Sequence, residues 1–436
     1  MDKPLPEYFN RVGDLTDRLW TDKGRMTRAF PHVAAQALKE FPPYEHIAAH
    51  DVVQWVLGAR ELPRQHIEHK FGEPGIQVFV RPDFFIEVLF WLEGSPDIHQ
   101  HGFSGVFYVL SGSSVHTEWA FKLNTQFDGN LRAGILRVLR TEYLGQGSYR
   151  SIGSGRDFIH SLSHLERPSV TIVVRTTGEP DAIPQWSYQK PGLAWNPFHR
   201  DECLSRQIDL LDMLFKVDRS QYVDAAICAI ARPEMSPYGV FKILNGCFDK
   251  NDEDAFSRLL EATQQRERDL AEIFQDVFSN QARDRHLQIQ RNVLREPGHR
   301  LALAILVDAP GRQAALELVH SKFPDAEPAS VLGRLIGEMA TVKSRGFPTL
   351  LSSFSDVDLL MIPEILASYR PDVIADKLGK KGIEASTERV RDCYDRVRCC
   401  SILRHLLDDS HSELRLPHSS TAPTSSHRKI TIENRT

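Results

Sequence analysis

A pair of histidines separated by one residue, His99 and His101, most constrains the fold of this chain. The pair stands immediately before an apolar segment that runs to Leu110. Because alternate side chains of a β-strand share a face, both imidazoles can reach one ion from a single strand. The pattern therefore predicts two metal ligands on one strand.

The same alternation continues through the apolar segment. It places Phe103, Gly105, Phe107 and Val109 on the inward face that carries the two histidines. Gly105 has no side chain, so we expect a gap in this wall that leaves room beside a metal.

A third ligand is expected from another strand. Residues 147–160 read as a strand, a turn marked by glycines and a second strand that opens with His160. Residues 169–174 are mostly β-branched and predict one more buried strand. We therefore predict a metal site built from His99, His101 and His160. Three neutral imidazoles with open positions suit Fe(II), and other divalent ions such as Zn, Ni, Cu or Mn could also bind.

These motifs resemble the cupin superfamily, whose members are small antiparallel barrels with a metal in the mouth. The residues that match the first and then the second cupin motif are Gly94, His99, His101 and Gly112, followed by Gly147, Gly153, Gly155 and His160. The usual cupin glutamate is missing, because its place falls at Gly105 or Val106.

A cupin with three histidines and no carboxylate is similar to the cysteine dioxygenase branch of thiol dioxygenases. Residues 79–81, 85–91 and 99–101 follow that pattern, and the resemblance covers roughly the first 180 residues. It implies non-haem iron, O2 and a small thiol as substrate, with Arg81 near the arginine that holds the substrate carboxylate. The Ser-His-Tyr relay of that branch is not found, since residues 169–175 contain neither histidine nor tyrosine. A Cys-Tyr crosslink near the metal is also excluded, because the first cysteine is Cys203.

Other polar side chains near these motifs leave alternatives open. His164 could be a general base or a hydrogen-bond donor to a ligand, or a turn residue that faces solvent. His116 and Glu118 share a strand face and could add ligands, or could simply pair with neighbours. Tyr149 could act as a phenolic acid, whereas alternation points Tyr108 outward.

Composition bounds the function classes. At 436 residues the chain predicts two folded units, and 41% hydrophobic and 25% charged residues are typical of a soluble globular protein. The net charge of -5 without a basic stripe argues against nucleic-acid binding. No run approaches roughly 18 apolar residues and the first residues lack an apolar signal core, so we expect no membrane partner and a cytoplasmic location. All six cysteines lie after residue 200 and are expected to be reduced.

Changes in periodicity predict the domain organisation. Helical spacing in residues 7–40 and 50–57 precedes strands in residues 77–174, and a strap rich in Pro and Trp follows in residues 176–200. Helical spacing then dominates to about residue 407. We predict a multidomain chain: residues 1–200 as an all-β jelly-roll barrel of cupin type with N-terminal helices, residues 201–408 as an all-α domain, and residues 409–436 as a disordered tail.

Three functions fit this chain, and the first is a mononuclear iron dioxygenase that oxidises a small thiol or related polar metabolite with O2. The second is a non-catalytic module that binds a metal or ligand. The third is a metal-dependent lyase or isomerase. The helical domain is expected to bind a protein partner, to form a homo-oligomer or to cover the barrel.

Overall fold

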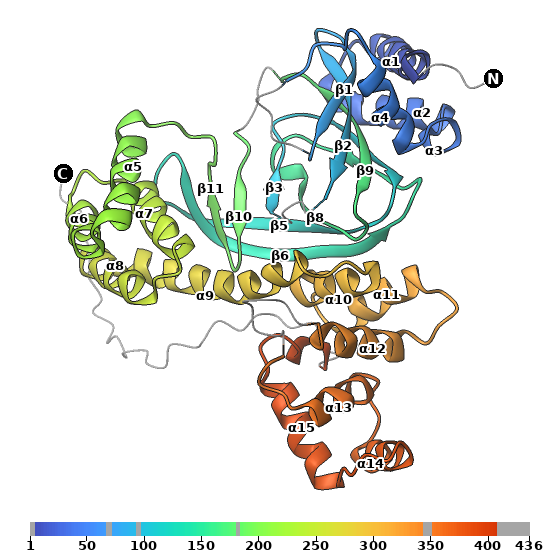
Figure 1. Cartoon of the computed structure of the whole chain (residues 1–436). Coiled ribbons are helices and arrows are strands. Elements are labelled where there is room, and N and C mark those ends of the chain that lie inside the picture. Colours follow the sequence, from blue (N-terminus) through green and yellow to red (C-terminus); the bar gives the residue numbers. More distant parts are fainter. Residues whose placement is uncertain (1–4, 67–71, 93–96, 180–183, 343–350, 408–436) are drawn as a thin grey trace, which may run out of the picture.

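The computed structural model describes residues 5–66, 72–92, 97–179, 184–342 and 351–407. Figure 1 shows a β-rich N-terminal part, with short helices on one side of it, and a helical C-terminal part. The N-terminal helices are α1 (Leu5–Asp22), η1 (Thr27–Ala29), α2 (Phe30–Glu40), α3 (Pro43–His46) and α4 (Ala49–Gly58). This order agrees with the predicted helices that precede the strands.

The strands form one open sheet and one closed barrel. In sheet order, the five-stranded sheet contains β1 (Gly75–Val80), β2 (Phe84–Trp91), β9 (Ser169–Thr176), β4 (Gly105–Ser111) and β7 (Tyr149–Ile152). The closed barrel contains β10 (Ser187–Gln189), β11 (Leu193–Trp195), β6 (Leu131–Leu144), β5 (Ser114–Gln126), β8 (Ile159–His164) and β3 (Ile98–Gln100). A closed β-barrel in the first half of the chain was predicted, and its presence is confirmed.

The hydrophobic core of the β-part lies between these two sets of strands. Phe107 and Val109 from β4 meet Leu144 from β6 and Leu162 from β8 in one apolar cluster. Phe103 belongs to the same cluster, so the predicted inward face from Phe103 to Val109 is confirmed. Successive residues of a strand face opposite sides, which is why Tyr108 lies on the other face.

The outer face of the five-stranded sheet is covered by the N-terminal helices. Phe9 and Val12 from α1 and Ala34 from α2 are buried in one cluster with Ile86 and Val174. Burying each large apolar side chain stabilises a fold by about 1.5–3 kcal/mol, so this contact fixes the helices to the sheet. The helices therefore pack outside the barrel, as expected.

The segment that follows β9 differs from its prediction. We expected an extended strap, but residues 187–195 form two strands that close the barrel. Tyr188 of β10 pairs with Ile98 of β3, and Ala194 of β11 pairs with Arg132 of β6. The strand propensity is hidden by Pro191 and Gly192, which form the turn between the two strands.

The helical part begins at α5 and runs to the end of the described residues. Its elements are α5 (Glu202–Val217), α6 (Arg219–Ala231), α7 (Pro237–Asp249), α8 (Glu253–Arg266), α9 (Arg268–Arg291), α10 (Pro297–Asp308), α11 (Arg312–Lys322), α12 (Pro328–Ala340), α13 (Asp356–Leu366), α14 (Pro371–Lys380), α15 (Thr387–Cys399) and η3 (Arg404–Leu406). Figure 1 shows α9, α10 and α11 running along the outer side of β5 and β6. The helical part therefore covers one wall of the barrel.

Two apolar clusters join the helices to the barrel. Leu131 and Leu193 are buried with Phe241 of α7 and its neighbours, and Val115 is buried with the cluster of α10 to α15. The first helix of this part begins at Glu202, close to the predicted boundary at residue 200. The predicted division into domains stays a prediction, and the predicted tail at 409–436 lies outside the described residues. In the described parts of the chain, no helix has both the length and the hydrophobicity to cross a membrane.

The turn that closes the barrel yields a test of this architecture. A Cβ at Gly192 would overlap the carbonyl oxygen of Gly134, a backbone atom that cannot move alone. We expect Gly192→Ala to lower the free energy of unfolding by about 2 kcal/mol through overpacking. Gly129→Ala is the control, because no atom lies within 4 Å of a Cβ at that position. Urea unfolding followed by tryptophan fluorescence measures both, and equal stability of the two variants would contradict the close approach.

Candidate metal centre

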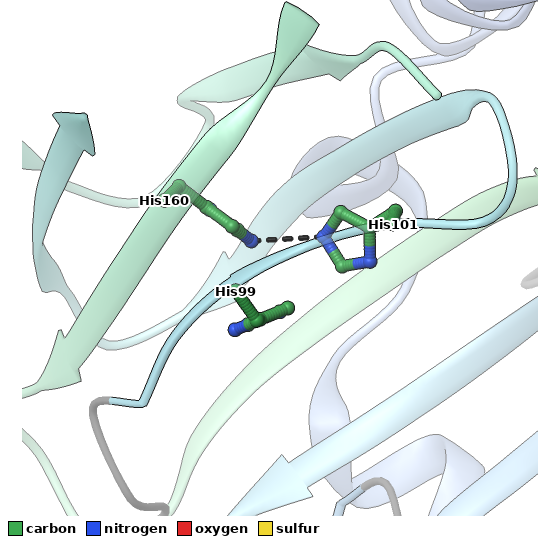
Figure 2. A group of neighbouring side chains, drawn as sticks. All are labelled: His99, His101 and His160. Carbon is green, nitrogen blue, oxygen red and sulfur yellow. Dashed lines mark hydrogen bonds between the residues drawn. The ribbon is translucent and has the colours of Figure 1, made fainter. Parts of the chain in front are cut away.

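Three histidines from two neighbouring strands meet in the space between the closed barrel and the five-stranded sheet. His99 lies on β3 directly opposite His160 on β8, and His101 follows the end of β3, where it forms a bridge with Ser154. Directly opposed residues of an antiparallel pair present their side chains on one face. Figure 2 shows the three rings grouped in one space, with His101 and His160 tip to tip. The structure thus brings together the predicted trio.

The distances in this group suit a single ion. The ligand atoms of the three residues all lie within 4.8 Å of one another. Nε2 of His101 lies 2.9 Å from Nε2 of His160. Two nitrogens bound about 2.1 Å from one ion are about 3 Å apart when the angle at the ion is near a right angle. The observed separation therefore matches two ligands on adjacent corners of a coordination sphere.

A hydrogen bond indicates which ring nitrogen of His99 carries the proton. Its Nδ1 lies 2.8 Å from the carbonyl oxygen of Asp97, which can only accept, so Nδ1 carries the proton. Nε2 then carries no proton, which is the form that binds a metal. The Nδ1 atoms of His101 and His160 are buried and have no hydrogen-bond partner among the described residues. The Nε2 atoms, which face each other, are therefore the nitrogens through which these two rings can bind an ion.

Burial keeps these imidazoles neutral. His101 and His160 are 6% and 3% exposed, and His99 is half-buried. Desolvation lowers the pKa of His99, and it lowers the pKa of His101 and His160 well below the usual value. A neutral imidazole is the ligand form, so the environment favours metal binding at neutral pH.

Phenylalanine rings surround the trio. Phe103 lies against His101 with ring centroids 4.5 Å apart, and Phe158 lies 4.6 Å from His160. Phe107 lies 5.9 Å from the His160 ring. This apolar wall excludes water and strengthens electrostatic interactions within the site.

The gap expected at Gly105 is closed. A Cβ at Gly105 would overlap the carbonyl oxygen of Val174 and lie 3.0 Å from Cα of Arg175. The glycine is needed because β9 approaches β4 closely, so it opens no space beside the three histidines. That prediction was wrong, and its physical reason is strand packing that the sequence does not reveal.

The side chain of Arg175 lies near the trio instead. It is largely buried, its guanidinium lies 3.7 Å from the centroid of Phe103, and its charge contributes to the lowered pKa of His101. Nη1 is 3.7 Å from Oε1 of Glu87. Burial lowers the pKa of Arg175, while Glu87 opposes that shift. A cation from β9, a strand of the five-stranded sheet, thus lies near the three histidines.

Arg81, which the family resemblance singled out, is placed elsewhere. Its Nη2 lies 2.7 Å from Oδ1 of Asp14 on α1, and its guanidinium lies 5.2 Å from the centroid of Phe79. The side chain is 46% exposed. The structure does not bring Arg81 to the three histidines, because its position at the end of β1 turns it towards α1.

His164 is buried on the face of β8 that carries His160. Its ring stacks on Trp91 with centroids 4.8 Å apart, and Nδ1 lies 2.9 Å from the hydroxyl of Ser114. Burial, with smaller effects of Arg291 and Arg300, lowers the pKa of His164 to about 3. The alternative of a turn residue facing solvent was wrong. Its contacts do not bring it into the trio.

A second polar group lies beside the trio. His116 is fully buried, its ring centroid is 5.3 Å from that of His160, and its Nδ1 lies 2.9 Å from Oε1 of Glu142. Burial alone would raise the pKa of Glu142, but hydrogen bonds from Arg150 and His116 outweigh it and hold the pKa at about 2. Glu118 pairs with Arg140 at 2.6 Å. The ligand atoms of His116, Glu118 and Glu142 lie within 4.8 Å of one another, but arginines neutralise both carboxylates.

The two tyrosines lie in the layer that faces the helices. Tyr149 pairs with Tyr108 across β7 and β4, and Lys39 of α2 lies 5.3 Å from the Tyr149 ring centroid. Burial raises the pKa of Tyr108 to about 12. The outward direction predicted for Tyr108 is confirmed, and Tyr149 shares it.

Sequence reasoning missed Arg175, Glu142 and Phe158 as parts of this interior. Alternation could have found Arg175, because Thr171, Val173 and Arg175 share one face of β9. No local signal marks Glu142 as the partner of His116, since that contact depends on the pairing of β5 with β6. Gly94 of the first cupin motif lies outside the described residues. Comparison with protein-family models and with curated proteins found no match to this chain.

The buried His164 predicts a pH effect on stability. The folded protein binds a proton at His164 only near pH 3, whereas an unfolded chain binds it below about pH 6.5. Because the unfolded state binds more protons in this window, stability falls as the pH drops from about 6.5 towards 3. We expect His164→Asn to remove up to about 1.4 kcal/mol per pH unit from that slope.

Urea unfolding at several pH values between about 7 and 4 measures the slope. His32→Asn, at an exposed position on α2, is the matched control and should leave the slope unchanged. An unchanged slope in the His164 variant would contradict its burial as a neutral imidazole.

Proposed function

We propose that this protein is a mononuclear non-haem iron dioxygenase of cupin type, similar to cysteine dioxygenases, which oxidises a small thiol with O2. The observation that carries the proposal is the meeting of His99, His101 and His160, with Nε2 atoms 2.9 Å apart in two of them. Three neutral imidazoles leave positions of an ion open for substrate and O2. In this proposal the three histidines hold the metal.

Iron would supply the electrons that make O2 reactive. The reaction R–SH + O2 → R–SO2H balances without a further reductant, so the protein needs only to bind and orient its substrates. The rings of Phe103, Phe107 and Phe158 support this chemistry because they exclude water from the ligands. The chain needs no redox partner for this step.

Arg175 is the residue we propose to orient the substrate. A guanidinium binds a carboxylate through two parallel hydrogen bonds, and Arg175 lies beside Phe103 in the interior. Its present partner Glu87 is 3.7 Å away, beyond hydrogen-bond distance, so an anionic group can compete for it. This assignment replaces Arg81, whose guanidinium is bound to Asp14 on the surface.

One observation favours a second function, a non-catalytic module that binds a metal or ligand. The space expected at Gly105 is filled by β9, so the interior offers less room for two substrates than the sequence suggests. A metal-dependent lyase or isomerase would use the same ligands without O2. O2 uptake with a thiol supports the dioxygenase. Ligand binding without turnover supports the non-catalytic module, and anaerobic turnover supports the lyase or isomerase.

Metal content tests the centre itself. Protein purified without added metal is expected to contain about one iron per chain by inductively coupled plasma analysis, and His99→Ala and His160→Ala should lose most of it, because two nitrogens alone hold an ion weakly. His32→Ala is the control and should keep its iron. Absence of metal from the wild type, or metal retained by both variants, would refute the three-histidine site.

Variants of Arg175 and Arg81 form a matched pair that tests substrate binding. With O2 uptake on a panel of small thiols that carry a carboxylate, Arg175→Met is expected to raise KM at least about tenfold, because a bidentate ion pair is lost. Arg81→Met should leave KM unchanged. Arg175→Lys keeps the charge and should restore part of the affinity, which separates binding from folding. Equal KM values in the Arg175 and Arg81 variants would refute the role of Arg175.

A further inference from the structure

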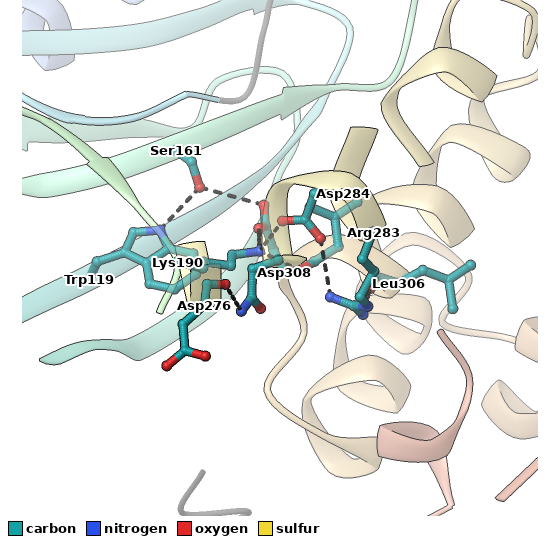
Figure 3. A network of polar contacts seen from close by, with 10 residues as sticks. Trp119, Ser161, Lys190, Asp276, Arg283, Asp284, Leu306 and Asp308 are labelled. Carbon is teal, nitrogen blue, oxygen red and sulfur yellow. Dashed lines mark hydrogen bonds and ion pairs between the residues drawn. The ribbon is translucent and has the colours of Figure 1, made fainter. Parts of the chain in front are cut away.

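A network of charged side chains joins the helical part to the turn that follows β10. Nζ of Lys190 donates to Asp284 of α9 at 3.2 Å and to Asp308 of α10 at 3.3 Å. It also donates to the carbonyl oxygen of Val307 at 2.8 Å. Arg283 pairs with Asp284 at 3.1 Å, so each carboxylate has a cation beside it. Figure 3 shows Lys190 between the two carboxylates where the strands meet the helices.

This network lies mostly out of water. Asp308 is buried, and the side chains of Lys190 and Asp284 are largely buried. Burial raises the pKa of Asp308, and the adjacent Lys190 opposes that shift. Removing one member of a buried ion pair leaves the other charge without compensation, which is costly. The contact therefore fixes Lys190, and with it the end of β10, to α9 and α10.

Trp119 of β5 is held by the same network. Its Nε1 donates to the hydroxyl of Ser161 at 3.1 Å, and that hydroxyl donates to Oδ2 of Asp308 at 3.5 Å, the outer limit of a hydrogen bond. Nζ of Lys190 lies 5.4 Å from the centroid of the indole, within the range of a cation–π contact. Ser161 is the residue that follows His160. Groups anchored on α10 thus reach the strand that carries a metal ligand.

The indole of Trp119 also supports both strands that carry the histidines. It is buried in one cluster with Ile98 and Ile159. Ile98 precedes His99 on β3, and Ile159 precedes His160 on β8. Successive residues of a strand face opposite sides, so the side chains behind the two histidines pack with this indole. The position of Trp119 therefore affects the position of the two rings.

We propose that Lys190 and Asp308 are positioning residues for the metal centre, and that through them the helical part sets the spacing of the three histidine rings. The inference rests on the proposed metal centre but not on the reaction at that centre. Loss of the ion pair removes contacts that fix Trp119, and β3, which is three residues long, then shifts relative to β8. Ligands bind an ion well only within narrow limits of geometry, so a small shift weakens metal binding.

Titration of the metal-free full chain with cobalt(II) tests the proposal, because the visible absorption of bound cobalt reports both affinity and ligand geometry. Lys190→Met and Asp308→Asn are each expected to weaken cobalt binding about tenfold, as the loss of groups that orient metal ligands does, and to shift the absorption bands. A merely structural role would lower the urea midpoint without changing the bands of the folded protein.

Ser161→Ala tests the same path in the variant whose fold is least disturbed. It removes only the hydroxyl that lies between Trp119 and Asp308. We expect a smaller loss of cobalt affinity than in the two charge variants, with the absorption bands shifted in the same direction.

Lys322→Met is the matched control. Nζ of Lys322 on α11 pairs with Glu166, just after β8, at 3.1 Å, and the side chain is 13% exposed against 18% for Lys190. Its Nζ lies 5.3 Å from the ring centroid of Tyr143 rather than beside Trp119. This variant removes a similar ion pair between the same two parts of the protein, so its cobalt affinity and bands should match the wild type.

Wild-type affinity and bands in the Lys190 and Asp308 variants would overturn the positioning role, and so would an equal loss of affinity in the Lys322 variant. A wild type that binds no cobalt would overturn the metal centre and this inference together. A wild type that binds cobalt with the expected differences among the variants, but whose iron form takes up no O2 with thiols, would support the positioning role and refute only the proposed reaction.

Discussion

The antiparallel pairing of β3 with β8 is the constraint on which the site depends. It places His99 opposite His160. His101 follows the end of β3 and forms an isolated bridge with Ser154. A shift of one residue in this register would turn one ring to the other face, since strand side chains alternate. β3 is only three residues long, so its own bonds cannot hold that register. Its neighbours on both sides, β8 and β10, must hold it.

Closure of the barrel supplies this support. β10 pairs with β3, and β11 returns the chain to β6, so β3 has a partner on each edge. A closed ring has no free edge at which strands can slip or pair with another chain. The helices then fix the closing strands from outside, through Leu131 and Leu193 in the cluster around Phe241. The helical part therefore contributes to the geometry of a site that it does not enter.

The two faces of β3 serve two different environments. Towards the five-stranded sheet, imidazoles meet phenylalanine rings and one buried guanidinium, which is an environment for an ion and an anionic group. On the opposite face, Ile98 is buried with Trp119, Ile159 and Tyr188 inside the closed barrel. Because alternate residues of one strand face opposite sides, a group of polar side chains and an apolar core can lie one residue apart.

Local periodicity determined a large part of this protein. Alternation in the sequence indicated the inward face from Phe103 to Val109 and placed His99 and His101 on one face, and a histidine at the start of a further strand, His160, was the predicted third ligand. Helical spacing located α1, α2 and the start of the helical part near residue 200.

Only the tertiary structure decided that Gly105 serves close strand packing, that Arg175 rather than Arg81 lies beside the histidines, and that residues 187–195 close the barrel. These features depend on which strands pair and in what register. The strands that pair are far apart in the chain: His101 and His160, for example, are separated by 59 positions in the sequence. A side-chain pattern encodes the face of a strand, whereas the partner of that face is chosen by long-range packing.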